Sequence, residues 1–147
     1  MKNIMILTGH VEYAKGVQSN LTFIAGEQED LYAIDFLMDD TEEMLKGKFK
    51  AILNQTVGAN HVFICDLLGG TPFRCAAELS QEQEGIEVVC GITSSSLIEA
   101  LFLKDTMSIE ELAQSLVDKT HDSCTRFKRS KDVQHSSNSV ETELDGI

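Results

Sequence analysis

Short apolar runs alternate with amphipathic segments along most of the chain, and this alternation narrows its possible folds more than any other feature. The runs at residues 3–8, 31–36, 61–65 and 87–91 are five or six residues long, as in buried strands. Between them, apolar residues recur every three or four positions, which is typical of one face of a helix. Strands that alternate with helices predict an α/β fold: an open, doubly wound, mostly parallel sheet with helices on both faces and strand order 2-1-3-4.

The helical segments carry recognisable start signals. Asp40 and Glu43 have the spacing of a capping box, in which two side chains bond free N–H groups of the first turn. Ser108 and Glu111 have the same spacing. Thr71 precedes a proline, as an N-cap residue does. These signals predict helices at about 12–25, 40–57, 71–83, 94–102 and 108–121.

The periodic pattern covers most of the 147 residues, a length that suits a single domain. We expect this domain to span residues 1–129. Residues 130–147 are rich in serine and lack an apolar period, which predicts a disordered tail. Residues 124–129 (CTRFKR) are a candidate for a fifth, more polar strand at one edge of the sheet.

Charge and cysteine usage exclude several classes of function. Twelve basic and 24 acidic residues give a net charge of −12, which argues against nucleic-acid binding because that needs a basic surface. No apolar stretch reaches the ~18 residues of a membrane span, and the first run is too short for a signal peptide, so we expect a soluble, cytoplasmic protein. The widely spaced cysteines (Cys65, Cys75, Cys90, Cys124) favour buried free thiols over a metal site.

Two side chains of catalytic type follow strands that the predicted order makes neighbours. In an open parallel sheet, ligands bind beyond the carboxyl ends of the strands where the strand order reverses. His10 and Asp66 lie just past the first and third strands, at that position. Asp66 would accept a hydrogen bond from Nδ1–H and leave the Nε2 lone pair free, which suits nucleophilic catalysis by histidine. The alternative is an ordinary surface histidine at a strand–loop–helix junction.

The segment DLLGGTP has features of an anion site. Gly69 and Gly70 lack side chains and would let the backbone approach a ligand closely. Helices that begin after His10, after Gly70 and after Thr93 would point free N–H groups at the same edge of the sheet. The alternative is a plain turn followed by a helix cap. The sequence contains neither G-x-x-x-x-G-K-[ST] nor G-x-G-x-x-G, which argues against nucleotide hydrolysis and dinucleotide binding.

The other histidines have simpler interpretations. His61 opens a strand and is expected at the edge of a loop. His121 lies near the end of a helix, where a cation is favoured, and His135 lies in the predicted tail.

Three segments together resemble a known family. ILTGHVEYAKGVQSNLTFIAGEQEDLYAIDF, VFICDLLGGTPFRCAAEL and VVCGITSSSLIEAL are similar to the IIA domain of the mannose family in the bacterial phosphoenolpyruvate-dependent sugar phosphotransferase system. The resemblance covers roughly residues 1–125. Its most diagnostic parts are the strand that leads into the histidine and the D-x-x-G-G-[ST]-P block.

The resemblance implies that His10 accepts a phosphoryl group on Nε2 from the histidine-containing phosphocarrier protein. His10 would then pass the group to a IIB component on a separate chain during sugar uptake and phosphorylation, beside a membrane sugar permease. It further implies Asp66 as the partner of His10, and Gly70, Thr71 and Thr93 as phosphoryl-binding residues. No metal or cofactor is implied. Family members are usually homodimers that exchange a C-terminal antiparallel strand, here residues 124–129.

The chain departs from the family pattern at two places. Val11 follows the histidine where the family usually has glycine, which brings a stiff β-branched side chain beside the site. Residues 92–94 read Ile-Thr-Ser where the family often has Asn-Leu-Pro. The sequence leaves the transported sugar open.

Two rival interpretations remain. The chain could be a non-catalytic regulatory module whose partner binding is switched by phosphorylation of His10. It could also be a flavodoxin-like binder of a flavin or small anion. Transfer of a labelled phosphoryl group to a IIB component would distinguish a carrier from a regulatory module, which would not pass the group on. Flavin absorbance of the pure protein would reveal a flavin binder.

Overall fold

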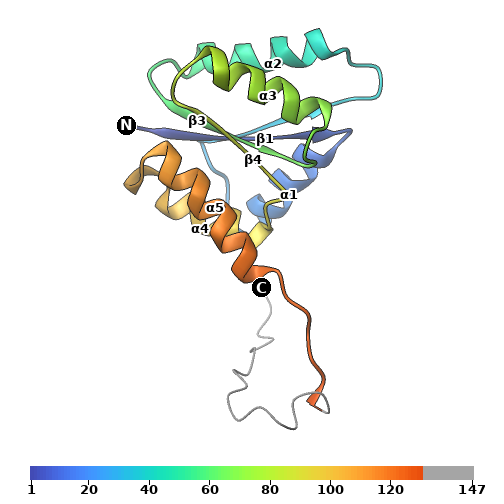
Figure 1. Ribbon diagram of the computed structural model, residues 1–147, viewed down its shortest axis with the longest axis vertical. Coiled ribbons are helices and arrows are strands. Elements are labelled where there is room, and N and C mark those ends of the chain that lie inside the picture. The colour runs from blue at the N-terminus through green and yellow to red at the C-terminus, as the bar shows by residue number, and fades with distance from the viewer. Residues whose placement is uncertain (131–147) are drawn as a thin grey trace.

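The sheet has four parallel strands in the order β2-β1-β3-β4, which confirms the predicted fold class. A computed structural model describes residues 1–130 of the chain (Figure 1). The strands are β1 (Asn3–His10), β2 (Leu31–Phe36), β3 (Asn60–Cys65) and β4 (Ile86–Cys90). The central strand β1 runs to His10 itself, beyond the predicted end at residue 8, so the histidine belongs to the sheet.

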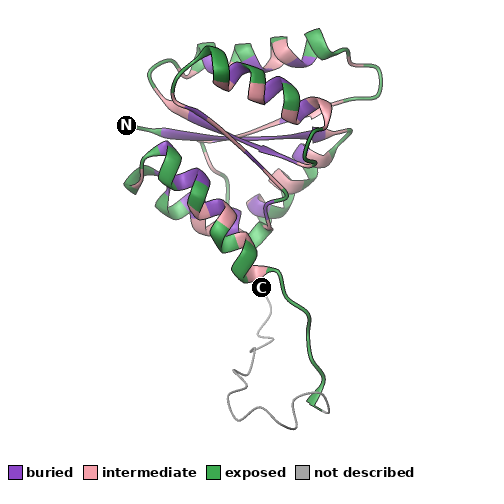
Figure 2. Cartoon of the chain, in the orientation of Figure 1, coloured by how far each residue is buried: buried purple, intermediate pink, exposed green. Residues whose placement is uncertain are grey.

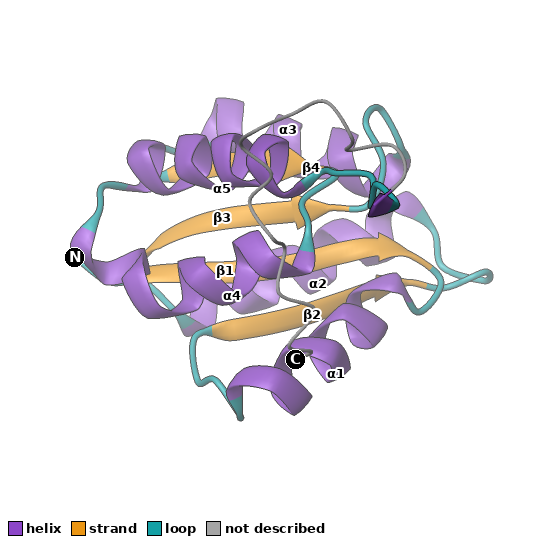
Figure 3. Cartoon of the chain, turned by 90° about the horizontal axis from the view of Figure 1, so that it is seen from below, coloured by secondary structure: helices purple, strands orange, loops and turns teal. Residues whose placement is uncertain are grey.

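Helices cover both faces of the sheet (Figure 1, Figure 3). One face carries α2 (Glu42–Gln55) and α3 (Thr71–Glu82). The other carries α1 (Tyr13–Ala25), α4 (Ser94–Leu103) and α5 (Ile109–Ser123), with the short 3₁₀ helix η1 (Lys104–Thr106) after α4. Within residues 1–130, no helix has the length and apolar character needed to cross a bilayer.

Strand β1 divides the core in two, because alternate side chains of a strand point to opposite faces. Ile4 and Ile6 join the cluster beneath α2 and α3, whereas Met5 and Leu7 join the cluster beneath α1, α4 and α5. Figure 2 shows β1 buried along nearly its whole length, with the exposed residues on the outer faces of the helices. A strand buried on both faces is fixed in register, and so is the residue at its end.

The helix starts partly match the predicted caps. At α5, Glu111 N donates to Ser108 Oγ (3.1 Å) and Ser108 N donates to Glu111 Oε2 (2.9 Å), which confirms that capping box. At α2 the prediction is one residue early, since Thr41 and not Asp40 is the N-cap. The carboxylate of Asp40 instead accepts from Leu37 N (2.8 Å) and pairs with the ammonium of Lys48 on α2 (2.6 Å). Thr71 is likewise the first residue of α3, after Gly70 as N-cap.

The prediction for His61 is wrong, because this side chain is only 2% exposed on β3. The hydroxyl of Thr56 donates to Ile52 O (2.7 Å), so it accepts from His61 Nε2 (2.7 Å). Nδ1 is buried without a hydrogen-bond partner among the described residues. Burial lowers the pKa of His61.

The cysteines only partly match the expectation of buried thiols. Cys65 and Cys75 are buried, Cys90 is half-buried and Cys124 is exposed. Burial raises the pKa of Cys75 to about 11, which keeps this thiol protonated and unreactive.

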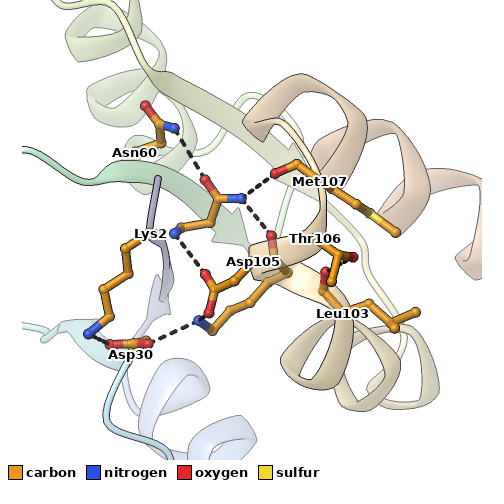
Figure 4. Close-up of polar contacts among 9 residues, drawn as sticks. Lys2, Asp30, Asn60, Leu103, Asp105, Thr106 and Met107 are labelled. Carbon is orange, nitrogen blue, oxygen red and sulfur yellow. Dashed lines mark hydrogen bonds and ion pairs between the residues drawn. The ribbon is translucent and has the colours of Figure 1, made fainter.

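A polar cluster joins the N-terminal end of β1 to η1, at the opposite end of the strand from His10 (Figure 4). Asn3 is fully buried, and its Nδ2 donates to Lys104 O (2.6 Å) and Met107 O (2.9 Å). The side chain of Lys104 is 6% exposed, and its ammonium pairs with Asp30 (3.0 Å) and Asp105 (2.7 Å). This cluster ties the connection between α4 and α5 to the start of the central strand.

Residues 124–129 follow α5 as exposed chain and form no strand in this single copy (Figure 1). A strand that forms through exchange between two copies stays a prediction. The predicted tail lies outside the described residues from residue 131 onward.

Candidate active site

The structure brings His10 and Asp66 into direct contact, as the strand order predicts. Asp66 follows the last residue of β3, next to the end of β1. Its Oδ2 accepts from the backbone N–H of His10 (2.9 Å) and lies 2.8 Å from Nδ1 of the same residue. One carboxylate oxygen therefore holds both the main chain and the ring of the histidine.

This contact determines which ring nitrogen of His10 is free. A carboxylate only accepts hydrogen bonds, so Nδ1 carries the hydrogen and the neutral ring has its lone pair on Nε2. The His10 side chain is 40% exposed, whereas that of Asp66 is 15% exposed. The arrangement is a largely buried carboxylate behind an accessible imidazole whose Nε2 could act as a nucleophile.

Aromatic residues that sequence reasoning missed pack around this pair. Phe36 is the partner of His10 in the β1–β2 register, and the two rings meet edge to face with centroids 6.0 Å apart. Tyr13, at the start of α1, lies beside Asp66. Burial raises the pKa of Tyr13, and the charge of Asp66 raises it further. Phe36 is the last residue of the predicted second strand, which pairs with the first. To place it beside His10, however, one must know the register between the two strands.

Gly9 is required for the close approach of these groups. A Cβ at this position would lie 2.8 Å from Cγ of Asp66 and would overlap the ring of Tyr13. Any side chain here would push the carboxylate away from His10 or the tyrosine off the strand. Sequence analysis gave no role to this glycine, because its neighbours come from two other elements.

The start of α3 faces the free edge of the imidazole. A Cβ on Gly70 would lie 2.9 Å from Cε1 and 3.6 Å from Nε2 of His10, so only glycine fits without displacing the ring. Thr71 follows it, and its Oγ1 accepts from Arg74 Nη2 (3.3 Å). The N–H groups of a helix start form a natural anion site. Gly70 thus lies against the free edge of the imidazole and Thr71 follows it in the chain, while the phosphoryl-binding roles of both residues stay predictions.

Thr93 has a different set of partners. It is the N-cap of α4, and its Oγ1 lies 2.8 Å from Ser96 Oγ and 2.7 Å from Ser123 Oγ. Its backbone N–H donates to Thr120 Oγ1 (3.2 Å). Among the hydrogen bonds of the described residues, none joins Thr93 to His10, and its phosphoryl-binding role stays a prediction.

Val11 adopts the left-handed conformation, with φ of 54°, although its side chain is β-branched. For such a residue this φ is a genuine outlier and costs of order 1–3 kcal/mol. The backbone N–H of Val11 donates to Phe36 O (2.7 Å), which continues the β1–β2 ladder past His10. The chain therefore keeps a backbone suited to glycine at this position, with valine in its place.

A protein-family model described as "PTS system fructose IIA component" matches residues 4–117. The chain is 29% identical to the sorbose-specific EIIA component of Lacticaseibacillus casei, over 77% of this chain and 82% of that one. It is 26% identical to the fructose-specific EIIA component of Bacillus subtilis (strain 168), over 76% of this chain and 77% of that one.

A solved structure gives the same result. The mannose/sorbose-specific IIA subunit of the phosphotransferase system from Enterococcus faecalis superposes with a TM-score of 0.80 at 26% identity, covering 88% of this chain and 97% of that one. The family match, the relatives and the shared fold agree with one another, and the chain belongs to the mannose family of phosphotransferase system IIA components.

Proposed function

We propose that His10 is the phosphoryl carrier of this chain. It accepts the group from the histidine-containing phosphocarrier protein and passes it to a IIB component on a separate chain. The observation that carries the proposal is the contact between His10 Nδ1 and Asp66 Oδ2 (2.8 Å), which leaves Nε2 free beside Gly70. Membership of a family of phosphotransferase components supports the same reaction.

In the loading step, the Nε2 lone pair of His10 forms an N–P bond with the incoming phosphorus. The N–P bond to the donor's histidine breaks, and its electron pair stays on the donor ring nitrogen. The His10 ring keeps its hydrogen on Nδ1 and becomes cationic, and the adjacent carboxylate of Asp66 compensates this charge. In the unloading step, the N–P bond at His10 breaks and the group moves to the acceptor of the IIB component.

The phosphoryl oxygens would bind at the start of α3. Backbone N–H groups there carry partial positive charge, and the Thr71 hydroxyl lies next to Gly70. Fixed dipoles of this kind stabilise charge that develops during transfer without needing to reorganise. Thr93 contributes from the start of α4 in the same proposal.

We place this reaction in the cytoplasm, beside a membrane sugar permease. Residues 1–129 act as the IIA domain and residues 130–147 as its tail. The active form is a homodimer in which residues 124–129 form the exchanged edge strand.

Isotope-labelled phosphoenolpyruvate with the upstream components tests the proposal. The wild-type protein should gain one acid-labile, base-stable phosphoryl group, and His10→Ala should gain none. Asp66→Asn should fold but load at least about tenfold more slowly, because an amide no longer fixes the hydrogen on Nδ1. His121→Ala, an exposed histidine on α5, is the matched control and should load normally.

Loading of His10→Ala at the wild-type rate would contradict the assignment. The labelled wild-type protein is then mixed with a IIB component. Transfer of the label distinguishes a carrier from a regulatory module, which would keep its phosphoryl group.

A further inference from the structure

We propose that Arg74 is a positioning residue that turns the Thr71 hydroxyl into a hydrogen-bond donor for the phosphoryl group. The inference deepens the proposed function and rests on it. Nothing in the DLLGGTP pattern required an arginine one turn into the helix, and the role of Arg74 depends on where its guanidinium lies.

Arg74 reaches back to the free edge of His10 through two residues. Its backbone N–H donates to Gly70 O (2.9 Å), and its Nη2 donates to Thr71 Oγ1 (3.3 Å). Gly70 is the residue that lies against Cε1 and Nε2 of His10. The guanidinium and the threonine hydroxyl therefore share the first turn of α3, which begins directly after the glycine that lies against the ring of His10.

The direction of the hydrogen bond determines what Thr71 can do. A hydroxyl has one hydrogen to donate and two lone pairs to accept with. Because arginine only donates, the bond from Arg74 occupies a lone pair and directs the hydroxyl hydrogen elsewhere. A phosphoryl oxygen only accepts, so it needs this hydrogen. A free Thr71 would otherwise also be able to turn its hydrogen toward a backbone carbonyl, as Ser and Thr commonly do in helices.

The positive charge of Arg74 is also available at this position. No carboxylate of the described chain lies within ion-pair distance of its guanidinium, whereas Lys46 and Lys48 on the neighbouring helix are paired at 2.6 Å with Glu78 and Asp40. Glu78 lies one turn further along α3, and its pKa is lowered mainly by Lys46 and to a smaller extent by Arg74. The charge also strengthens the bond to Thr71, because charge-assisted hydrogen bonds are roughly twice as strong as neutral ones.

A double-mutant cycle tests the inference on the full chain. The variants are Arg74→Met, Thr71→Val and the two combined, with initial loading rates measured at limiting phosphocarrier protein. Arg74→Met and Thr71→Val should each load about tenfold more slowly, and the double variant no more slowly than Thr71→Val alone, since Arg74 acts through Thr71. Lys50→Met, which removes an exposed cation from α2, is the control and should load normally.

The readouts separate positioning from folding. Arg74 is exposed and Thr71 is half-buried in the first turn of α3. The melting temperatures of the Arg74 and Thr71 variants should therefore stay near that of the wild type. Arg74→Lys keeps a charge and a donor and should restore most of the rate. Additive losses in the double variant, or a rate for Arg74→Met equal to that of Lys50→Met, would overturn the inference. A wild-type protein that gains no phosphoryl group on His10 would instead overturn the proposed function.

Discussion

At the scale of single residues, the site depends on one oxygen atom with two hydrogen bonds. Asp66 Oδ2 accepts from the main chain of His10 and lies against its ring nitrogen. On the side of β1 that faces β3, the backbone N–H of His10 is therefore bound by the side chain of Asp66, just past β3, rather than by a carbonyl. Any movement of this carboxylate changes the strand end and the ring orientation together.

Replacement of Gly9 by alanine tests this coupling. The added methyl group would lie 2.8 Å from Cγ of Asp66 and would overlap Tyr13, so one of the two must move. We expect a loss of about 1–3 kcal/mol in the free energy of unfolding, as for other overpacked sites, and slower loading of His10. Denaturant unfolding measures the first and the labelling assay the second.

Gly16 provides a matched control for Gly9→Ala. It lies inside α1 with open space where a Cβ would be. Gly16→Ala should raise the free energy of unfolding by about 0.5–1 kcal/mol through helix propensity. A Gly9→Ala protein as stable as the wild type, with normal loading, would show that the site tolerates a displaced carboxylate.

The sequence predicted the His10–Asp66 contact because strand order alone decides which strand ends are neighbours. It could not predict Gly9, Phe36 or Tyr13 as part of the site, since their contacts depend on register and on the path of α1. Val11 shows the same limit. The sequence indicated a stiff side chain where the family usually has glycine, but the φ of 54° comes from the structure.

At the scale of secondary-structure elements, the end of β1 opposite His10 is fixed by polar contacts. The amide of Asn3 binds two backbone carbonyls of the segment that connects α4 to α5, at Lys104 and Met107 (Figure 4). Apolar periodicity predicted the strand and the helices. It gave no sign of this cluster, because the partners of Asn3 lie more than 100 residues away along the chain.

Asn3→Ala should destabilise the protein by about 1–3 kcal/mol, because two carbonyls lose their donor in a buried place. Urea unfolding measures the change. Asn20→Ala, on the exposed face of α1, should change the free energy of unfolding by less than about 0.5 kcal/mol. Equal values for the two variants would mean that the cluster adds nothing to stability.

Element boundaries show where a local pattern is sufficient. The Ser108–Glu111 capping box was correct because both partners lie within one turn. The start of α2 was placed one residue early because two possible caps adjoin. The carboxylate of Asp40 lies 2.6 Å from the ammonium of Lys48, so Asp40 does not cap the helix. Thr41 is the N-cap residue instead.

At the scale of the whole molecule, stability should depend on pH through His61. Its pKa is lowered in the folded state, so below about 6.5 the unfolded chain binds a proton that the folded chain does not. The contribution of His61 to stability should be constant above that pH and fall below it, by at most about 1.4 kcal/mol per pH unit for one proton. The loss should end at the lowered pKa of the folded state.

Urea unfolding at several pH values between about 7.5 and 5 measures this slope, within the range where histidine titrates. His61→Gln should remove most of it, whereas His121→Gln, at an exposed position, should retain it. An unchanged slope in His61→Gln would contradict the assignment. The hydrogen bond from Lys104 lowers the pKa of Asp105 in the folded state below its ordinary value of 3.8. A further loss of stability should therefore begin as the pH falls through about 3.8, where the unfolded chain takes up a proton first.

The position of His10 at the end of a strand has a consequence for timing. The His10 side chain is 40% exposed, so a phosphoryl group carried there, as we propose, would face water until another protein covers it. The lifetime of this phosphoryl group would then depend on its rate of spontaneous hydrolysis, and its transfer on how soon an acceptor protein binds. A site built in this way would suit rapid relay between proteins rather than long storage.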